Sequence, residues 1–289
     1  MFQPVRASQM KITSEPMPSL TVGQRWFLKS LLFCSGKLIQ IEGLDRELIS
    51  KNPIIFALNH NCSYETILVP AYLIALRNGG KISFVIDWMF GHFPLLSWIF
   101  KQIDPIYVFN KKSNFSFLNH FRSGHQRGTA HSSNVYQQCI QRLNQGGSIG
   151  IFPEGTRNRN PQTLLRGKKG IGYIALRSQA SVIPVGIDFP CRIQKNKIPK
   201  FGPLIIRFGA EMNFSEERSI YLQINNSRLI HPVIKRKIGD YLSEKITYGI
   251  MREVSRLSGK QYPFHAPTPP AAMKRFIFSP DLIKSESVY

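Results

Sequence analysis

The chain has 289 residues and is 43% hydrophobic, which is enough for one large domain or two small ones with a real core. Its 38 lysine and arginine residues face 17 acidic residues, and a net charge of +21 favours an anionic partner, nucleic acid or a membrane face, over a merely soluble basic surface. The cysteines Cys34, Cys62, Cys139 and Cys191 form no CxxC pair, which argues against a zinc site or a disulfide framework and suits a reducing cytoplasm.

The N-terminal region predicts a polar lead-in followed by one helix. Residues 1–19 lack the basic-then-apolar order of a signal peptide. Residues 21–37 predict a helix that stops at Gly36, because apolar residues recur there at helical spacing. Trp26 stands among cations, so this helix fits a membrane interface, and a helix packed on its own domain remains equally open. No run reaches the roughly 18 uncharged apolar residues that a spanning helix needs.

From about residue 52, short apolar runs alternate with helical stretches. The runs of strand length are 54–58, 82–86, 105–109, 148–152, 181–187 and 204–208. The helical stretches lie near 65–77, 93–102, 134–145, 168–179 and 228–257. This alternation predicts an α/β fold with a mainly parallel or mixed central sheet flanked by helices. In such sheets, functional residues gather at the carboxyl ends of the strands.

These patterns divide the chain into three expected parts. Residues 1–49 form the lead-in with a membrane-proximal helix, and residues 50–260 form the α/β domain. Residues 261–289 are expected to form a flexible C-terminal tail, because they are proline-rich at first and lack periodicity.

A long polar loop at residues 110–132 contains His120, His125 and His131. It contains no cysteine, aspartate or glutamate, and the spacing of its histidines matches no metal site that we can justify. We therefore expect a solvated basic loop and no metal.

The first candidate site is the stretch NHNCSYET, residues 59–66, directly after the first predicted strand. His60 and Glu65 are about 140° apart on a regular helix, so only a turn could bring them together. A carboxylate that binds one imidazole nitrogen leaves the other free to take a proton, as in a general base. An alternative role for Glu65, as a negative charge that stabilises the N-terminus of the following helix, remains open. Cys62 and Ser63 are weaker candidates as nucleophiles.

The second candidate site is the stretch FPEGTR, residues 152–157, which also follows a predicted strand. Gly155 permits close backbone approach. The cations of this connection are Arg157, Arg159, Arg166, Lys168 and Lys169. Cations and exposed backbone N–H groups suit a phosphate ester. No GxxxxGK[ST] pattern is present, so this is no ordinary nucleoside-triphosphate loop.

The two stretches, about 90 residues apart, together resemble the glycerolipid acyltransferase family that includes the 1-acylglycerol-3-phosphate acyltransferases. The family motifs are His-x4-Asp and Phe-Pro-Glu-Gly-Thr-Arg. Residues 182–188, VIPVGID, resemble its later block, and residues 105–112, PIYVFNKK, stand in place of its middle block, which usually ends in arginine. The resemblance covers roughly residues 50–210. It implies transfer of an acyl group from a thioester to the hydroxyl of a lysolipid or glycerol phosphate, in phospholipid biosynthesis.

The resemblance also implies the roles of the first motif. His60 would deprotonate the acceptor hydroxyl, which attacks the thioester carbonyl directly without an acyl-enzyme. Glu65 would take the place of the family's aspartate, with one methylene more, and orient the imidazole.

For the second motif, the resemblance implies a phosphate pocket for the acceptor. Arg157 would bind the phosphate, in a loop shaped by Glu154, Gly155 and Thr156. Lys111 would take the place of the middle-block arginine.

The expected partners are an anionic membrane surface, acyl-CoA or acyl carrier protein as donor, and a lysolipid acceptor, with no nucleic acid and no cofactor. We expect the protein on the cytoplasmic side of a membrane, peripheral or monotopic. The aromatic stretch 87–102 fits lipid contact or an acyl-chain channel, and equally a core helix. Two alternatives remain open: a catalytically inactive lipid-binding relative, because glutamate replaces aspartate, and a basic nucleic-acid-binding protein, although no binding module is found.

Overall fold

The protein is represented by a computed structural model that describes residues 5–6, 16–87, 105–108, 132–190, 196–228, 230–271 and 273. Several predicted features lie outside these residues. They are the helix near 93–102, the aromatic stretch after Asp87, Lys111, and His120, His125 and His131.

Eight strands of the described chain form one sheet, in the order β1-β2-β8-β7-β3-β6-β4-β5. Their bounds are β1 (Val5–Arg6), β2 (Ile39–Glu42), β3 (Ile54–Leu58), β4 (Ile82–Asp87), β5 (Ile106–Val108), β6 (Ser148–Ile151), β7 (Ser181–Asp188) and β8 (Leu204–Phe208). The strands from β7 to β5 in this order are mutually parallel. β8 is antiparallel to β7, β2 is parallel to β8, and β1 is antiparallel to β2. The predicted α/β fold with a mainly parallel or mixed sheet is confirmed.

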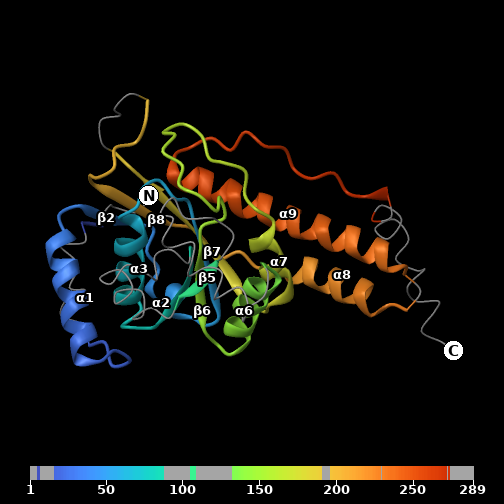
Figure 1. Cartoon of the computed structure of the whole chain (residues 1–289), viewed down its shortest axis with the longest axis horizontal. Coiled ribbons are helices and arrows are strands. Elements are labelled where there is room, and N and C mark those ends of the chain that lie inside the picture. The colour runs from blue at the N-terminus through green and yellow to red at the C-terminus, as the bar shows by residue number, and fades with distance from the viewer. Residues whose placement is uncertain are drawn as a thin grey trace, which may run out of the picture.

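Helices cover both faces of this sheet (Figure 1). Their bounds are α1 (Val22–Ser35), α2 (Arg46–Ser50), α3 (Glu65–Leu76), α6 (Ser132–Asn144), α7 (Gly170–Arg177), α8 (Ser215–Asn226) and α9 (Pro232–Ser258). α1 and α3 pack with β2, β7 and β8 in one apolar cluster, while α6, α7 and α9 contribute to another.

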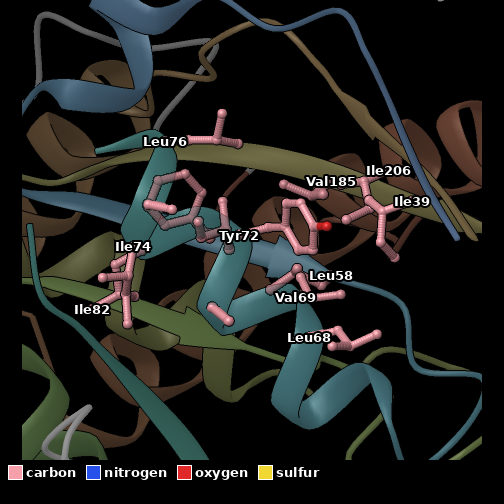
Figure 2. Packing of buried hydrophobic residues seen from close by; sticks show 14 of the residues in the cluster. Ile39, Leu58, Leu68, Val69, Tyr72, Ile74, Leu76, Ile82, Val185 and Ile206 are labelled. Carbon is pink, nitrogen blue, oxygen red and sulfur yellow. The ribbon is translucent and has the colours of Figure 1, made fainter. Parts of the chain in front are cut away.

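The central strand β3 separates these two apolar clusters. All five of its residues are buried, and they alternate between the clusters: Ile54, Phe56 and Leu58 belong to one, Ile55 and Ala57 to the other. This alternation follows from the two-residue period of a strand. Figure 2 shows the first cluster, in which Tyr72 of α3 lies among residues of β3, β7 and β8. A strand buried on both faces fixes the position of whatever follows its carboxyl end.

Helix α1 both packs on the domain and exposes apolar side chains. It begins at the capping box of Thr21 and Gln24, and it ends at Gly36 as predicted. Leu28 and Leu32 are buried, whereas Val22, Trp26 and Phe33 are exposed. In the described part of the chain, none of the helices is both long and apolar enough to cross a bilayer.

Described segments at both ends of the chain lie in the domain although the sequence assigns them elsewhere. β2 precedes residue 50 and pairs with β8, so the sheet includes part of the expected lead-in. After α9, the chain turns back along this helix (Figure 1), and its first residues belong to the expected tail. Gln261 exchanges backbone hydrogen bonds with residues 162 and 164, and Met273 is buried in the second cluster. Four-residue strands and lone backbone pairings carry little periodic signal.

Candidate active site

The two candidate motifs meet because their strands are neighbours in the sheet. β3 and β6 are parallel, and Ala57 pairs with Ile151. The carboxyl ends of parallel strands lie at the same edge. His60 follows the end of β3 by two residues, and Glu154 follows the end of β6 by three. The turn after β3 and the loop after β6 therefore form one site.

The first motif is a turn built around the carboxylate of Glu65, which opens α3 and is fully buried. Its Oε2 lies 3.2 Å from His60 Nδ1 and accepts from the backbone N–H groups of Asn61 at 2.7 Å and Cys62 at 3.2 Å. Its Oε1 accepts from the Asn61 side-chain amide at 3.0 Å. The turn expected between His60 and Glu65 is therefore present, and these donors fix the carboxylate against the imidazole.

The second motif is joined to the first through Glu154, which is buried. Its Oε1 accepts from the backbone N–H of His60 at 3.3 Å. Its Oε2 accepts from the Asn158 side chain at 3.0 Å and from the Leu165 backbone at 2.8 Å. Burial raises the pKa of Glu154, and these hydrogen bonds oppose the rise. The Glu154 carboxylate therefore links the turn after β3 to the loop after β6 by hydrogen bonds.

A third strand, β7, also contributes to the site, because its end forms hydrogen bonds with the turn after β3. Ile187 N donates to Asn59 Oδ1 at 2.6 Å, and Ile187 O accepts from the side chains of Asn59 and Asn61 at 2.9 and 3.0 Å. Ile187 belongs to the VIPVGID stretch. This stretch therefore supports the turn that carries His60.

The exposed part of the FPEGTR loop faces the same turn. Arg157 Nη1 donates to Ser63 Oγ, so the guanidinium lies beside the His60 turn. Gly155 has φ +64°, and a Cβ there would lie 2.5 Å from Lys168 Nζ. The left-handed backbone favours glycine at this position, and any larger residue would also displace the end of the flexible Lys168 side chain. Thr156 is exposed next to them.

The rival nucleophiles of the turn are poorly placed for that role. Burial raises the pKa of the Cys62 thiol, and the neighbouring Glu65 carboxylate adds to the rise. The thiol donates to Glu65 Oε1 at 3.2 Å, so it stays protonated. Ser63 Oγ accepts from Arg157. His60, which stacks against Phe152 with ring centroids 4.6 Å apart, remains the candidate base.

Sequence reasoning missed the side chains that support the two acids. Asn59 and Asn61 lie within the first motif and Asn158 directly follows the second, and short amide side chains on both sides of His60 were an available signal. Lys260 lies 199 residues from Asn61, and its Nζ donates to Asn61 Oδ1 at 2.5 Å. No sequence pattern joins two positions so far apart.

The described residues contain no group of three or more His, Cys, Asp or Glu side chains arranged to hold a metal ion. The predicted Lys111 contact and the histidine loop lie outside the described residues.

The chain is similar to the following known proteins. Residues 39–188 match the model of the family described as Acyltransferase. The 1-acyl-sn-glycerol-3-phosphate acyltransferase of Borreliella burgdorferi is 32% identical over 111 residues, which cover 38% of this chain and 36% of that protein. The match therefore spans about a third of the relative's length. The crystal structure of the 1-acyl-sn-glycerophosphate (LPA) acyltransferase PlsC from Thermotoga maritima is 16% identical, with a TM-score of 0.44 over 81% of this chain and 82% of that one.

Proposed function

The chain belongs to the acyltransferase family, and we propose that it moves a fatty acyl group from a thioester to the hydroxyl of a lysophosphatidate-like lysophospholipid. The donor is a thioester of coenzyme A or of acyl carrier protein. The observation that carries this proposal is the His60–Glu65 pair, which lies at the carboxyl edge of the sheet beside a loop with an exposed arginine.

In the proposed reaction, His60 is the general base. Because Glu65 binds Nδ1, Nε2 is left to take the proton of the acceptor hydroxyl. The hydroxyl oxygen attacks the thioester carbonyl carbon, and the C–S bond breaks when the tetrahedral intermediate collapses. The thiolate leaves and receives the proton from the imidazolium. Glu65 stabilises that imidazolium while it exists, and no acyl-enzyme forms.

The acceptor phosphate is proposed to bind at Arg157. One of its N–H groups is held by Ser63, and the others suit a bidentate contact with phosphate oxygens. The Lys168 ammonium over Gly155 adds a second cation on the same loop. The relative from Borreliella burgdorferi is named for a phosphate-bearing acceptor, which supports this assignment.

The reaction is proposed to take place at the cytoplasmic surface of an anionic membrane, with the protein peripheral or monotopic. Val22, Trp26 and Phe33 are exposed and lie on one side of α1, at offsets of four and eleven residues. Such a face suits the boundary between head groups and acyl chains. The net charge of +21 favours an anionic leaflet, toward which each nearby cation contributes about 1 kcal/mol.

The test is acyl transfer by detergent-purified protein. Labelled long-chain acyl-CoA and acyl carrier protein are each offered with lysophosphatidate, other lysophospholipids and an unphosphorylated acceptor. Arg157→Ala is run beside the wild type, and Arg252→Ala, an exposed arginine on α9, is its matched control. We expect product with lysophosphatidate and a rise of about tenfold or more in its KM for Arg157→Ala only.

Binding to anionic vesicles without any product from any donor and acceptor would contradict the proposed reaction. It would favour a lipid-binding relative without chemistry. Equal activity of Arg157→Ala on lysophosphatidate would remove Arg157 from the phosphate site.

A further inference from the structure

A lysine from the far end of the domain lies beneath the candidate active site. Lys260 is only 5% exposed. It follows Gly259, whose φ of +68° ends α9 and turns the chain toward the two motifs. The neighbouring Gln261 is fixed by backbone hydrogen bonds to residues 162 and 164, so the position of Lys260 is set by its main chain.

The ammonium of Lys260 joins both motif loops. Its Nζ donates to Asn61 Oδ1 at 2.5 Å and to Asn160 O at 2.8 Å. The first contact fixes which way the Asn61 amide points, together with the hydrogen bonds from Asn59 Nδ2 to Asn61 Oδ1 and from Asn61 Nδ2 to Ile187 O. Because Oδ1 faces the lysine, Nδ2 faces Glu65 Oε1, to which it donates at 3.0 Å. Lys260 thus acts on Glu65 through the Asn61 amide.

The charges of the site depend on the same lysine. Glu65 and Glu154 are two buried acidic side chains, and Lys260 is a buried basic side chain that interacts electrostatically with both. Burial lowers the pKa of Lys260, and the carboxylates of Glu154 and Glu65 oppose this change. Without the lysine, the imidazolium would face two uncompensated carboxylates.

Other charged or titratable groups lie around this cluster. They are Cys62 and Tyr64 on the His60 turn, Asp188 at the end of β7, and Arg157 on the FPEGTR loop. Burial raises the pKa of Cys62 and of Tyr64, so both are neutral at neutral pH. Among the described groups that contact Asn61, Lys260 is the one that is both buried and basic.

We propose that Lys260 is a positioning residue for His60, because it orients Glu65 through Asn61 and places a positive charge near the two carboxylates of the site. This role rests on the acyl transfer proposed above, in which a protonated His60 cannot act as the base. The effect of Lys260 on the His60 imidazole can be measured whether or not the chain transfers acyl groups.

The first test is titration of the His60 imidazole by NMR in the purified full chain, with the signal assigned from its loss in His60→Gln. Lys260→Met removes the cation, Lys260→Gln keeps a donor without charge, and Lys260→Arg keeps the charge. Lys237→Met, an exposed lysine of α9, is the matched control. If Lys260→Met does not fold, Lys260→Gln carries the same test.

We expect the pKa of His60 to rise by about one unit in Lys260→Met and Lys260→Gln. It should stay near the wild-type value in Lys260→Arg and Lys237→Met. An unchanged His60 titration in folded Lys260→Met or Lys260→Gln would overturn the proposal.

The second test is the pH dependence of acyl transfer by Lys260→Gln. We expect kcat at neutral pH to fall about tenfold, most of this loss to be recovered at higher pH, and KM to change less than twofold. A role in folding alone would lower kcat equally at all pH values, which would overturn the proposal. Absence of activity in the wild type would instead contradict the proposed function, while the NMR titration would still decide the role of Lys260.

Discussion

Glu154 accepts a hydrogen bond from the backbone N–H of His60, with 3.3 Å between Oε1 and N, although 94 residues separate the two. The next peptide bond is held from the same loop, because Asn158 N donates to His60 O at 2.7 Å. Both sides of the His60 main chain are thus bound by the FPEGTR loop. The two motifs form one unit, so a change in either loop should alter the other.

Glu154→Gln tests the hydrogen bonds by which Glu154 links the two motifs. The carboxylate accepts three N–H groups, and an amide must turn its own N–H₂ toward at least one of them. A buried unsatisfied donor costs about 1 to 3 kcal/mol, so we expect a loss of that size in the free energy of unfolding, together with lower activity. Denaturant unfolding measures the loss. Glu253→Gln, in an exposed ion pair on α9, should change stability by less than about 1 kcal/mol.

The same variant should change how stability depends on pH. Burial raises the pKa of Glu154, so the folded protein keeps this proton to a higher pH than the unfolded chain does. The contribution of this group to stability is therefore greatest below its unfolded pKa and falls as the pH rises through its folded pKa. We expect the stability advantage of the wild type over Glu154→Gln to shrink as the pH rises from about 4 toward neutrality. Unfolding at a series of pH values measures it, and a growing advantage would contradict the assignment.

Glu65→Asp tests whether the turn is built for the longer acid. Aspartate stands at this position in the motif that the sequence resembles, yet the Glu65 carboxylate here binds His60, Asn61 and Cys62 within 2.7 to 3.2 Å. A carboxylate shortened by one methylene loses these contacts. We expect kcat to fall by about 10²-fold, the usual cost of a displacement near 1 Å. Steady-state kinetics on folded protein measures it, and activity at or above wild type would show that the turn adapts.

Gly172→Ala tests the close contact of α7 with α9. A Cβ at this position would overlap the Ser243 carbonyl oxygen and lie 2.6 Å from Thr247 Oγ1. We expect a loss of about 1 to 3 kcal/mol or more in the free energy of unfolding.

The matched control for Gly172→Ala is Gly249→Ala on α9. Its added methyl group would meet its nearest neighbour at 3.8 Å. Because alanine favours helix more than glycine does, we expect a gain of up to about 1 kcal/mol. Equal effects of the two substitutions would show that helix propensity, and not the close contact, decides the outcome.

The sequence predicts the parallel half of the sheet well, because strands buried on both faces are continuous apolar runs. IIFAL and SVIPVGI correspond to β3 and to nearly all of β7. β2 was missed, since IQIE alternates between buried and partly buried residues over only four positions. α8 was missed as well, because only Ile224 among its residues is buried and its apolar face is weak.

The candidate site divides in the same way. His60, Glu65 and the FPEGTR residues stand in local patterns next to predicted strands, and the family resemblance implies that the two motifs form one site. The second function of Glu154, as an acceptor for the His60 backbone, depends on β3 and β6 being neighbours, which no local pattern states. Lys260 depends in addition on how α9 ends. The sequence alone does not indicate that Lys260 is buried, because its burial results from how the chain folds.

The most direct test of the central claim is a single-turnover assay of acyl transfer to lysophosphatidate by wild-type protein and by His60→Gln. His265→Gln, an exposed histidine outside the site, serves as the control. We predict ester formation by the wild type and by His265→Gln, with release of the donor thiol only when the acceptor is present. The rate should fall by about 10²- to 10⁴-fold in folded His60→Gln. A rate for His60→Gln equal to that of the wild type would contradict the claim that His60 is the base.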